Sequence, residues 1–417
     1  MPIDANNVPE SFRWFVESRL GLFIHWGLYA LPARHEWVKN FERIRNEDYQ
    51  KYFDRFDPDL YDPKAWAKAA KAAGMRYFVI TTKHHEGFCL FDSQLTDYKA
   101  PNTPCGRDLL RPMVEAFREE GLKVGFYHSL IDWHHPDYTV DRMHPLRDDA
   151  EARAANAQRD FKRYREYLHG QVRELLTNYG RVDYIWFDFS YPGPDGKGRD
   201  DWGSEELLKM CRELQPGILV NDRLDLDEQG GWDVKTPEQV MVREPLRHNG
   251  KPIVWETCQT FSGSWGYHRD EATWKTVDQL LYLLIDTVSK GGNLLLNVGP
   301  TARGEFDDRA LSRLSAMGEW MRRHGRAIYG CGPAPAGFVA PDGCRLTYNP
   351  DLDRLYLHVL HWPIQDLHLD GFAGKVAYAQ LLHDASEVAM ATHGDTLTLR
   401  LPVIKPTVPI PVVELYR

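Results

Sequence analysis

The sequence predicts an α/β protein in which a (β/α)8-like barrel is followed by a small antiparallel β-sandwich. Up to about residue 328, apolar runs alternate with amphipathic stretches, and strand then helix recurs about seven or eight times. That order specifies a parallel sheet, and the length fits a (β/α)8 barrel. After Gly330 the pattern changes to an alternation of period two, which is typical of antiparallel strands. We therefore expect a barrel domain over residues 1–331 and a sandwich domain over 332–417.

The expected barrel strands are short apolar runs that end in polar or amphipathic residues. The clearest helix, 62–74, has Asp62 as N-cap, Pro63 at its first position and Gly74 after its end. Strands are expected at 20–27, 76–82, 122–128, 182–187, 218–221, 253–256 and 293–297. Helices are expected at 62–74, 108–120, 150–179, 204–214, 273–289 and 307–328.

The expected sandwich strands alternate apolar and polar residues and are separated by turn sequences. NPD at 349–351 and HGD at 393–395 supply turn chemistry. Strands are expected at 345–348, 354–359, 396–401 and 412–415.

The composition is ordinary for a soluble globular protein, with 43% hydrophobic and 27% charged residues. The net charge of −9 and the lack of a basic stretch argue against a nucleic-acid partner. No uncharged apolar run approaches the roughly 20 residues that a bilayer requires, so no membrane partner is expected. The N-terminus shows no signal peptide, which predicts a cytoplasmic protein, or a periplasmic or secreted one if a leader was removed. The six cysteines form no CxxC pair, and neither a metal nor a cofactor is expected.

Polar side chains stand at the carboxyl ends of successive expected strands. In a barrel of this kind the reacting groups lie at those ends, so the side chains should share one cleft. Each could singly be a satisfied core or loop residue, but seven at corresponding positions favour a functional site. They are His25, His84, His85, His128, Asp188, Arg223 and Glu256.

Asp188 is the most informative of these residues, because it ends an apolar run, 182–187, and is flanked by aromatic rings. A salt bridge or a cap would explain it alone, since charges are rarely buried unpaired. Together with the histidines and the arginine on neighbouring strands, however, it suits glycoside hydrolysis. That reaction needs one carboxylate to attack the anomeric carbon and a second acid to protonate the leaving oxygen. Asp188 suits the nucleophile, provided that a donor such as Arg223 keeps it ionised.

At these residues the sequence resembles the α-L-fucosidases of glycoside hydrolase family 29. The resemblance runs from residue 12 to about residue 300, and the motifs are specific because of their order. They are GLFIHWG at 21–27, EW at 36–37, KHHEGF at 83–88, GFYHS at 125–129, WFD at 186–188, NDR at 221–223, SWGY at 264–267 and GNLLLNVGP at 292–300. The family architecture, a catalytic barrel followed by a β-sandwich, agrees with the pattern of elements.

The resemblance implies a retaining, exo-acting α-L-fucosidase with Asp188 as nucleophile of a double displacement. Its partner would be a fucosylated oligosaccharide or glycoconjugate, and a homo-oligomer is left open. Trp265 would lie beside the methyl group of the fucose. The other implied sugar contacts are His25, Glu36, Trp37, His84, His85, His128, Trp186 and Arg223. The chain departs from the family at Phe189, where glycine is frequent, and in an acidic stretch at 224–228.

Two glutamates are candidates for the acid/base. The segment 232–239 resembles the family segment that supplies this group, which points to Glu238. Residues 236–238 look like a helix start, where the helix dipole would lower the pKa of a carboxylic acid. Glu256, in an apolar run, is better placed for a pKa raised by desolvation. We favour Glu238 and keep Glu256 as the alternative.

Two other functional classes are compatible with parts of the sequence. The pairs His84–His85 and His134–His135 would suit a metal-dependent hydrolase, but adjacent residues of a strand point to opposite faces and chelate poorly. A catalytically silent sugar-binding protein is the second alternative, and the presence of both carboxylate candidates argues against it. Within the enzyme class, an apolar pocket would reject an α-L-galactoside, with its added hydroxyl, only modestly.

Overall fold

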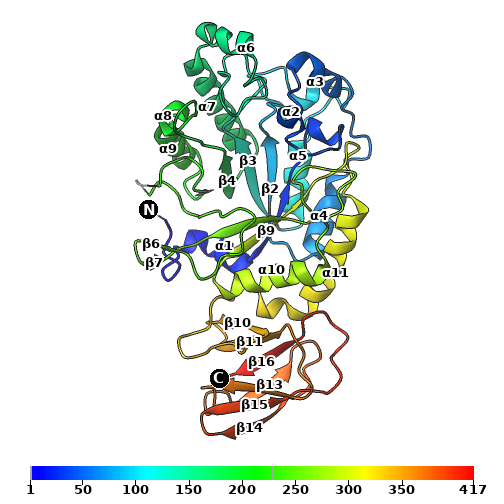
Figure 1. The fold of residues 1–417 in the computed structure, drawn as a ribbon, viewed down its shortest axis with the longest axis vertical. Helices are drawn as coiled ribbons and strands as arrows, with labels where there is room; N and C mark the ends of the chain where they lie inside the picture. The colour runs from blue at the N-terminus through cyan, green and yellow to red at the C-terminus, as the bar shows by residue number, and fades with distance from the viewer. Residues whose placement is uncertain (1, 228–229) are drawn as a thin grey trace.

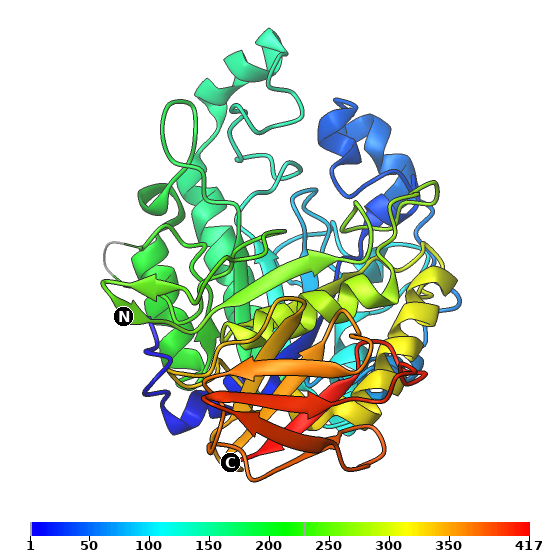
Figure 2. The same ribbon diagram turned by 60° about the horizontal axis from the view of Figure 1, so that its bottom comes forward.

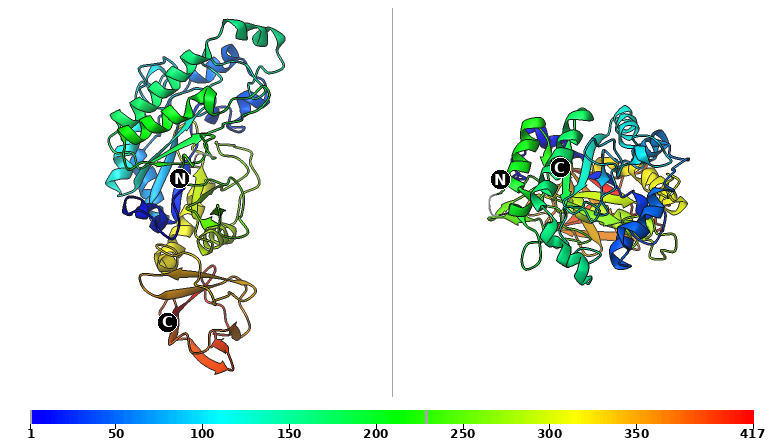
Figure 3. Two further views of the ribbon diagram at one scale, coloured as in Figure 1. Left: turned by 90° about the vertical axis from the view of Figure 1, so that its left-hand side faces the viewer. Right: turned by 90° about the horizontal axis from the view of Figure 1, so that it is seen from above.

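The computed structural model describes residues 2–227 and 230–417 and consists of a barrel with a β-sandwich at one end (Figure 1). A side view shows an elongated molecule with the sandwich at one end of its long axis (Figure 3, left). No helix in these two ranges is long and apolar enough to cross a membrane.

The barrel is a curled sheet of seven parallel strands in the order β5-β4-β3-β2-β1-β9-β8. Nearly every strand residue is buried, as expected for parallel strands covered on both faces. The strands are β1 (Leu20–Ile24), β2 (Tyr77–Lys83), β3 (Lys123–Ser129), β4 (Tyr184–Asp188), β5 (Leu219–Val220), β8 (Glu256–Thr260) and β9 (Asn293–Val298). The predicted fold class is confirmed.

An irregular segment, 233–239, fills the gap between β5 and β8. Val234 bridges Asn221, and Glu238 bridges Cys258, both in parallel. The Gln239 N–H donates to the Cys258 carbonyl at 3.0 Å. The helix start predicted at 236–238 is therefore wrong, because Pro237 and Gln239 exchange backbone hydrogen bonds with Cys258 of β8 instead of forming a helical turn.

Helices cover the outside of the barrel and begin at side-chain caps that the sequence shows. The Asp62 carboxylate accepts hydrogen bonds from the N–H groups of Lys64 and Ala65, as predicted. The single helix expected at 150–179 is instead two, because Asp160 caps a new helix. The helices are α4 (Pro63–Ala72), α5 (Leu110–Glu119), α6 (Ala150–Ala154), α7 (Phe161–Asn178), α9 (Ser204–Leu214), α10 (Val277–Ser289) and α11 (Asp308–His324).

Several short helices and strands lie in the loops that connect the main elements of the barrel domain. Helices α2 and α3, which follow β1, and α6, which follows β3, lie at the end away from the sandwich (Figure 1). The short elements are α1 (Arg13–Ser18), α2 (Val38–Phe41), α3 (Asn46–Phe53), α8 (Arg199–Trp202), β6 (Arg247–His248) and β7 (Lys251–Pro252).

The strand expected at 253–256 is displaced in the structure, since β8 begins at Glu256. Trp255 instead bridges Lys235 of the closing segment. Glu256 consequently lies at the amino end of its strand, opposite to the end on which the prediction placed it. The carboxyl end of β8 carries Thr260.

The C-terminal region forms two antiparallel sheets, in the orders β10-β11-β16-β13 and β12-β15-β14 (Figure 2). The four predicted strands are present, and three more, β12, β13 and β14, were not expected. β12 and β14 expose most of their residues, so they lack the alternation that marked the others. The strands are β10 (Cys344–Asn349), β11 (Arg354–Val359), β12 (Asp366–Asp370), β13 (Tyr378–Leu381), β14 (Ala389–His393), β15 (Thr396–Arg400) and β16 (Val412–Tyr416).

The larger of the two sheets packs against α10 and α11. The Arg345 Nε lies 2.8 Å from the buried Asp286 carboxylate of α10, and the Trp320 indole N–H of α11 donates to the Ile410 carbonyl at 3.1 Å. Tyr356 and Val412 belong to the same apolar cluster as the barrel core. This contact fixes the sandwich on the barrel.

Candidate active site

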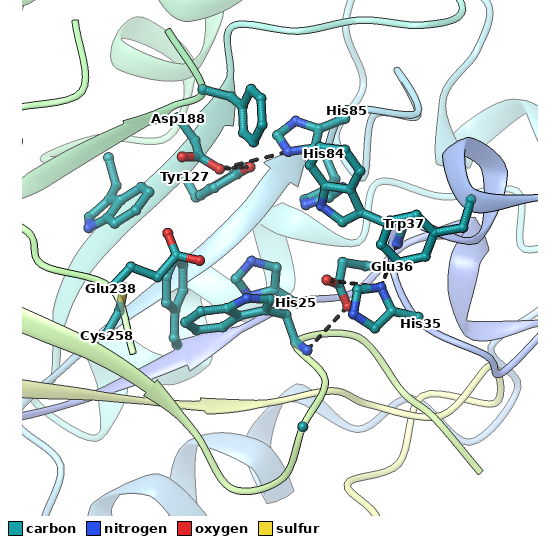
Figure 4. Close-up of a pocket in the computed structure, with 16 residues that line it drawn as sticks. His25, His35, Glu36, Trp37, His84, His85, Tyr127, Asp188, Glu238 and Cys258 are labelled. Carbon is teal, nitrogen blue, oxygen red and sulfur yellow. Dashed lines mark hydrogen bonds and ion pairs between the residues drawn. The ribbon is translucent and has the colours of Figure 1, made fainter. Parts of the chain in front are cut away.

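A cavity of about 380 Å³ opens at the carboxyl ends of β1 to β4 (Figure 4). It brings together Asp188 and Glu238, the two carboxylates favoured from the sequence. Three of the four histidines predicted as sugar contacts also line it, as do all three of the predicted tryptophans. The lining residues are Phe23, His25, His35, Glu36, Trp37, Phe41, His84, His85, Tyr127, Trp186, Asp188, Phe189, Glu238, Cys258, Gly263 and Trp265.

Asp188, the last residue of β4, has a hydrogen-bond donor on each carboxylate oxygen. Arg223 Nη1 donates to Oδ1 at 3.1 Å, and the Tyr127 hydroxyl donates to Oδ2 at 2.8 Å. His85 Nε2 lies 3.8 Å from Oδ2. Burial raises the pKa of Asp188 to about 6, although the Arg223 charge opposes this shift. The carboxylate is thus oriented, and it is ionised at neutral pH.

Arg223 also binds the second carboxylate, Glu238. Its Nη2 donates to Glu238 Oε2 at 3.0 Å and to the Thr236 carbonyl at 3.0 Å. The guanidinium lies 4.7 Å over the Trp186 ring. Because residue 236 is extended and not at a helix start, no helix dipole acts on Glu238. Its side chain is 41% exposed, so it stands at the open side of the pocket.

Glu256 does not line this cavity. It is fully buried at the start of β8, where the hydroxyls of Tyr77 and Tyr184 donate to its carboxyl oxygens. Burial raises its pKa to about 8, so the group is mostly protonated at neutral pH. The raised pKa expected from the sequence is confirmed, whereas the expected place at a carboxyl strand end is wrong.

Neutral histidines form one wall of the pocket. Burial lowers the pKa of His25 to about 3, and its Nδ1 lies 2.6 Å from Asn297 Oδ1. His85 Nδ1 lies 2.6 Å from Ser129 Oγ. His84 and His85 both line the cavity because β2 ends at Lys83 and they occupy the following turn. The expectation that they point to opposite faces is therefore wrong. Neutral imidazoles can donate to or accept from hydroxyl groups.

Glu36, in the loop that follows β1, binds the loop that follows β8 and carries Trp265. The Gly266 and Trp265 N–H groups donate to Glu36 Oε2 at 2.9 and 3.2 Å. Glu36 Oε1 lies 3.3 Å from His35 Nδ1. Trp265 packs 5.1 Å from the His25 ring. The buried carboxylate thereby fixes the loop that presents Trp265 to the pocket.

The histidine pairs do not form a metal centre in the described residues, where no group of three or more His, Cys, Asp or Glu side chains is arranged to hold an ion. His134 stacks on Tyr98 at 3.6 Å between ring centroids, and His135 packs on Tyr167 at 4.5 Å. Both rings therefore have packing roles away from the cavity.

The sequence model of the family described as Alpha-L-fucosidase matches residues 2–326. The chain belongs to the alpha-L-fucosidase family. It is accordingly a glycoside hydrolase, as the sequence predicted. Its fold is similar to that of α-L-fucosidase isoenzyme 1 from Paenibacillus thiaminolyticus, with 50% identity, 98% of each chain covered and a TM-score of 0.92.

Two further fucosidases illustrate the range of similarity. An α-L-fucosidase of family GH29 from Bacteroides thetaiotaomicron is 32% identical, with 98% of this chain and 95% of that chain covered and a TM-score of 0.86. The tissue α-L-fucosidase of Bos taurus is 30% identical over 391 residues, which cover 87% of this chain and 76% of that protein. A structure of the Bacteroides fucosidase holds a trapped covalent intermediate with 2-fluoro-fucosyl fluoride.

His128 is not brought to the fucosidase pocket, and Tyr127, which the sequence analysis missed, takes that position. His128 is fully buried behind β3, with Nδ1 2.9 Å from Thr82 Oγ1. The reason is the alternation of side chains along a strand. Tyr127 lies beside Trp186 in the β3–β4 register, and Trp186 shares the face of Asp188. The alternation of side chains along β3 and β4 is the feature of the sequence that could have indicated Tyr127.

Phe189, at the position where the family often has glycine, has a left-handed backbone with φ of +73°. Its ring packs 5.1 Å from both His85 and Trp37 and closes that side of the pocket. In the acidic stretch, Asp227 pairs with Lys235 at 3.3 Å, while Glu228 lies outside the described residues. The departure at 189 therefore adds a pocket wall at the cost of backbone strain.

Glycine and alanine at position 189 should separate the strain from the packing. Both variants lose the ring, but only alanine keeps a side chain in the left-handed region, which costs about 1–2 kcal/mol. The greater freedom of the unfolded glycine chain offsets about 0.5–1 kcal/mol. With mid-range values of both effects, we expect the free energy of urea unfolding of Phe189→Gly to exceed that of Phe189→Ala by about 0.5–1 kcal/mol. An alanine variant as stable as the glycine variant would contradict the strain.

Proposed function

We propose that the chain is a retaining, exo-acting α-L-fucosidase that releases terminal α-L-fucosyl residues from oligosaccharides or glycoconjugates. In this proposal Asp188 is the nucleophile and Glu238 the acid/base. The observation that carries it is the guanidinium of Arg223, which holds one carboxylate inside the cavity and the other at its open side. The catalytic unit would be residues 1–331, with residues 332–417 as a supporting domain.

The double displacement needs different protonation states of the two carboxyl groups. Asp188 attacks the anomeric carbon as the anion, while Glu238 gives its proton to the leaving glycosidic oxygen. The resulting fucosyl ester is then hydrolysed by a water molecule that passes its proton to Glu238. Arg223 and Tyr127 hold the Asp188 oxygens, so that the attacking carboxylate needs little rearrangement.

The remaining pocket residues suit a sugar with one apolar edge. His25, His84, His85, Glu36 and Trp37 all line the cavity, and each has a side-chain polar atom of a kind that can bind hydroxyl groups. Trp186 and Trp265 offer apolar ring faces, and we place the fucose methyl group beside Trp265. His128 is withdrawn from the proposed sugar contacts because it lies behind the strand.

Glu238 is preferred over Glu256 because of position. A general acid must come within hydrogen-bond reach of the oxygen that it protonates. Glu238 lines the cavity and is partly exposed, whereas Glu256 is fully buried at the amino end of β8, where the hydroxyls of Tyr77 and Tyr184 bind it. A pKa in a suitable range does not compensate for lack of access.

Replacing Asp188 by Ala should abolish turnover. Without the nucleophile no ester forms, and kcat on 4-nitrophenyl α-L-fucoside should fall at least about 10³-fold. This loss corresponds to an increase of about 4 kcal/mol in the activation free energy. Asp195→Ala, an exposed aspartate in the loop after β4, is the matched control and should retain full activity. Retained activity in the Asp188 variant, with an unchanged fold by circular dichroism, would show that another group attacks.

Replacing Glu238 by Ala should make the rate depend on the leaving group. Activity on a fucosylated disaccharide should fall about 10²–10⁴-fold, because a poor leaving group needs the acid. Activity on 4-nitrophenyl α-L-fucoside should fall less, and azide should restore turnover by attacking the ester without base assistance. If the Glu256 variant behaves in this way and the Glu238 variant does not, the assignment is wrong.

The acid limb of the pH profile should report Asp188. Its pKa is raised to about 6, so the ionised fraction, and with it kcat/KM, should fall as the pH drops through that value. Tyr127→Phe removes a donor that lowers this pKa, and the limb should therefore move to higher pH. Tyr356→Phe, in the sandwich sheet, is the control and should leave the profile unchanged. A limb that stays in place in Tyr127→Phe would contradict the role of this hydrogen bond.

A further inference from the structure

Asn297, near the carboxyl end of β9, is buried behind the pocket wall and takes no part in the proposed chemistry. In the sheet register it pairs with Phe23 of β1 on one side and with Thr260 of β8 on the other. Its side chain belongs to a residue that is only 2% exposed. Asn297 therefore stands between the strand that leads to His25 and the strand that leads to the Trp265 loop.

The amide of Asn297 connects those two pocket residues. Its Nδ2 donates to the Trp265 carbonyl at 2.7 Å, and its Oδ1 lies 2.6 Å from His25 Nδ1. A backbone carbonyl only accepts hydrogen bonds, so the NH2 group faces Trp265 and the amide oxygen faces His25. The amide oxygen is also only an acceptor. His25 Nδ1 must therefore carry the proton in this contact.

This contact determines what the other nitrogen of the His25 ring can do. Burial lowers the pKa of His25 to about 3, so the ring is neutral near neutral pH. A neutral imidazole holds a single N–H, and a ring protonated on Nδ1 presents Nε2 as an acceptor. His25 lines the cavity (Figure 4), and Nε2 makes no hydrogen bond with the described residues. Nε2 is thus the polar atom of His25 that is left for a ligand.

Aromatic packing keeps the His25 ring in this orientation. Its centroid lies 4.5 Å from that of Phe23 and 5.1 Å from that of Trp265, with interplanar angles of 64° and 34°. The Tyr127 ring lies 5.5 Å away. Turning the imidazole over would set a C–H group against the Asn297 oxygen and lose the 2.6 Å contact. The surroundings therefore favour one orientation and one tautomer.

We propose that Asn297 is a positioning residue that holds His25 as the tautomer protonated on Nδ1, so that Nε2 accepts a hydrogen bond from a fucose hydroxyl. The inference rests on the proposed sugar contact of His25. It gives that contact a direction, because the hydroxyl donates and the protein accepts. Fluorine in place of this hydroxyl cannot donate, and the pocket should reject it.

The tautomer can be measured in the wild-type protein. In a proton–nitrogen NMR correlation spectrum of protein labelled in histidine, the His25 signals are those that disappear in His25→Asn. Near neutral pH we expect Nδ1 to be protonated and Nε2 to be unprotonated. A wild-type His25 that is protonated on Nε2 would overturn the inference, whether or not any variant of Asn297 folds.

The coupling between Asn297 and the sugar is tested by binding. The probes are L-fucose and three analogues, each with fluorine in place of the hydroxyl at C2, C3 or C4. In the wild type, the analogue that lacks the donor to His25 should bind at least about tenfold more weakly than fucose. In Asn297→Leu, the Kd of fucose should rise about tenfold, and the penalty for that one analogue should shrink to less than about threefold.

Thr347→Val is the control for altered stability. Its hydroxyl is buried in the sandwich and donates to the Ala327 carbonyl at 2.7 Å, away from the pocket. This variant should bind all four sugars as the wild type does. Its unfolding midpoint shows how far a lost buried hydrogen bond alone changes the protein.

The results separate the alternatives. An Asn297→Leu protein that binds fucose like the wild type refutes the positioning role. Equal weakening for fucose and all three analogues, in a folded variant, would mean that the amide only supports the fold. A penalty at one hydroxyl that depends on Asn297 supports the inference.

The proposed function fails in other experiments. An active Asp188→Ala would refute the nucleophile and leave the His25 tautomer as it is. A wild-type protein that binds none of the four sugars would refute the fucose contact, while the NMR spectrum would still decide whether Asn297 sets the tautomer.

Discussion

The arrangement of the site depends on one guanidinium between two carboxylates. Asp188 is nearly enclosed, and burial alone would favour its neutral form. The Glu238 charge acts in the same direction, and the Arg223 charge is the largest effect that opposes both, with a smaller contribution from the Tyr127 hydrogen bond. Because Arg223 donates one nitrogen to each carboxylate, it also sets their relative position. Burial of Asp188 in an apolar strand is tolerable only with this cation beside it.

The closure of the barrel produces that arrangement. A regular eighth strand would bury its alternate side chains in the sheet. The extended segment that replaces it forms only isolated bridges, which leaves Glu238 beside Cys258 of β8 with its carboxylate free to face the cavity. Arg223 follows β5, the strand on the other side of this segment. The irregular closure thus brings the second carboxylate and the cation to the same opening.

Much of this could be predicted from the sequence, and the failures have identifiable causes. Strand-then-helix order and the polar strand ends gave the barrel and placed Asp188, His25 and Arg223 correctly. The prediction that His128 faces the cleft is wrong by one residue, since a shift of one residue along a strand reverses the face to which a side chain points. The closing segment looked like a helix because a Pro-Glu sequence also suits a helix start, and only its neighbours in the sheet decide. β12 and β14 were missed because an exposed edge sheet carries little apolar pattern.

The two glutamates show why environment and position must be considered together. From the sequence, Glu256 is the better acid, because an apolar surrounding raises a carboxyl pKa, and the structure bears out that shift. The same burial that raises the pKa removes the group from any substrate oxygen. Glu238 differs in position, because it lines the cavity, is 41% exposed and lies 3.0 Å from the Arg223 guanidinium. A general acid acts only within hydrogen-bond reach of the oxygen that it protonates, so access to the cavity decides between the two glutamates.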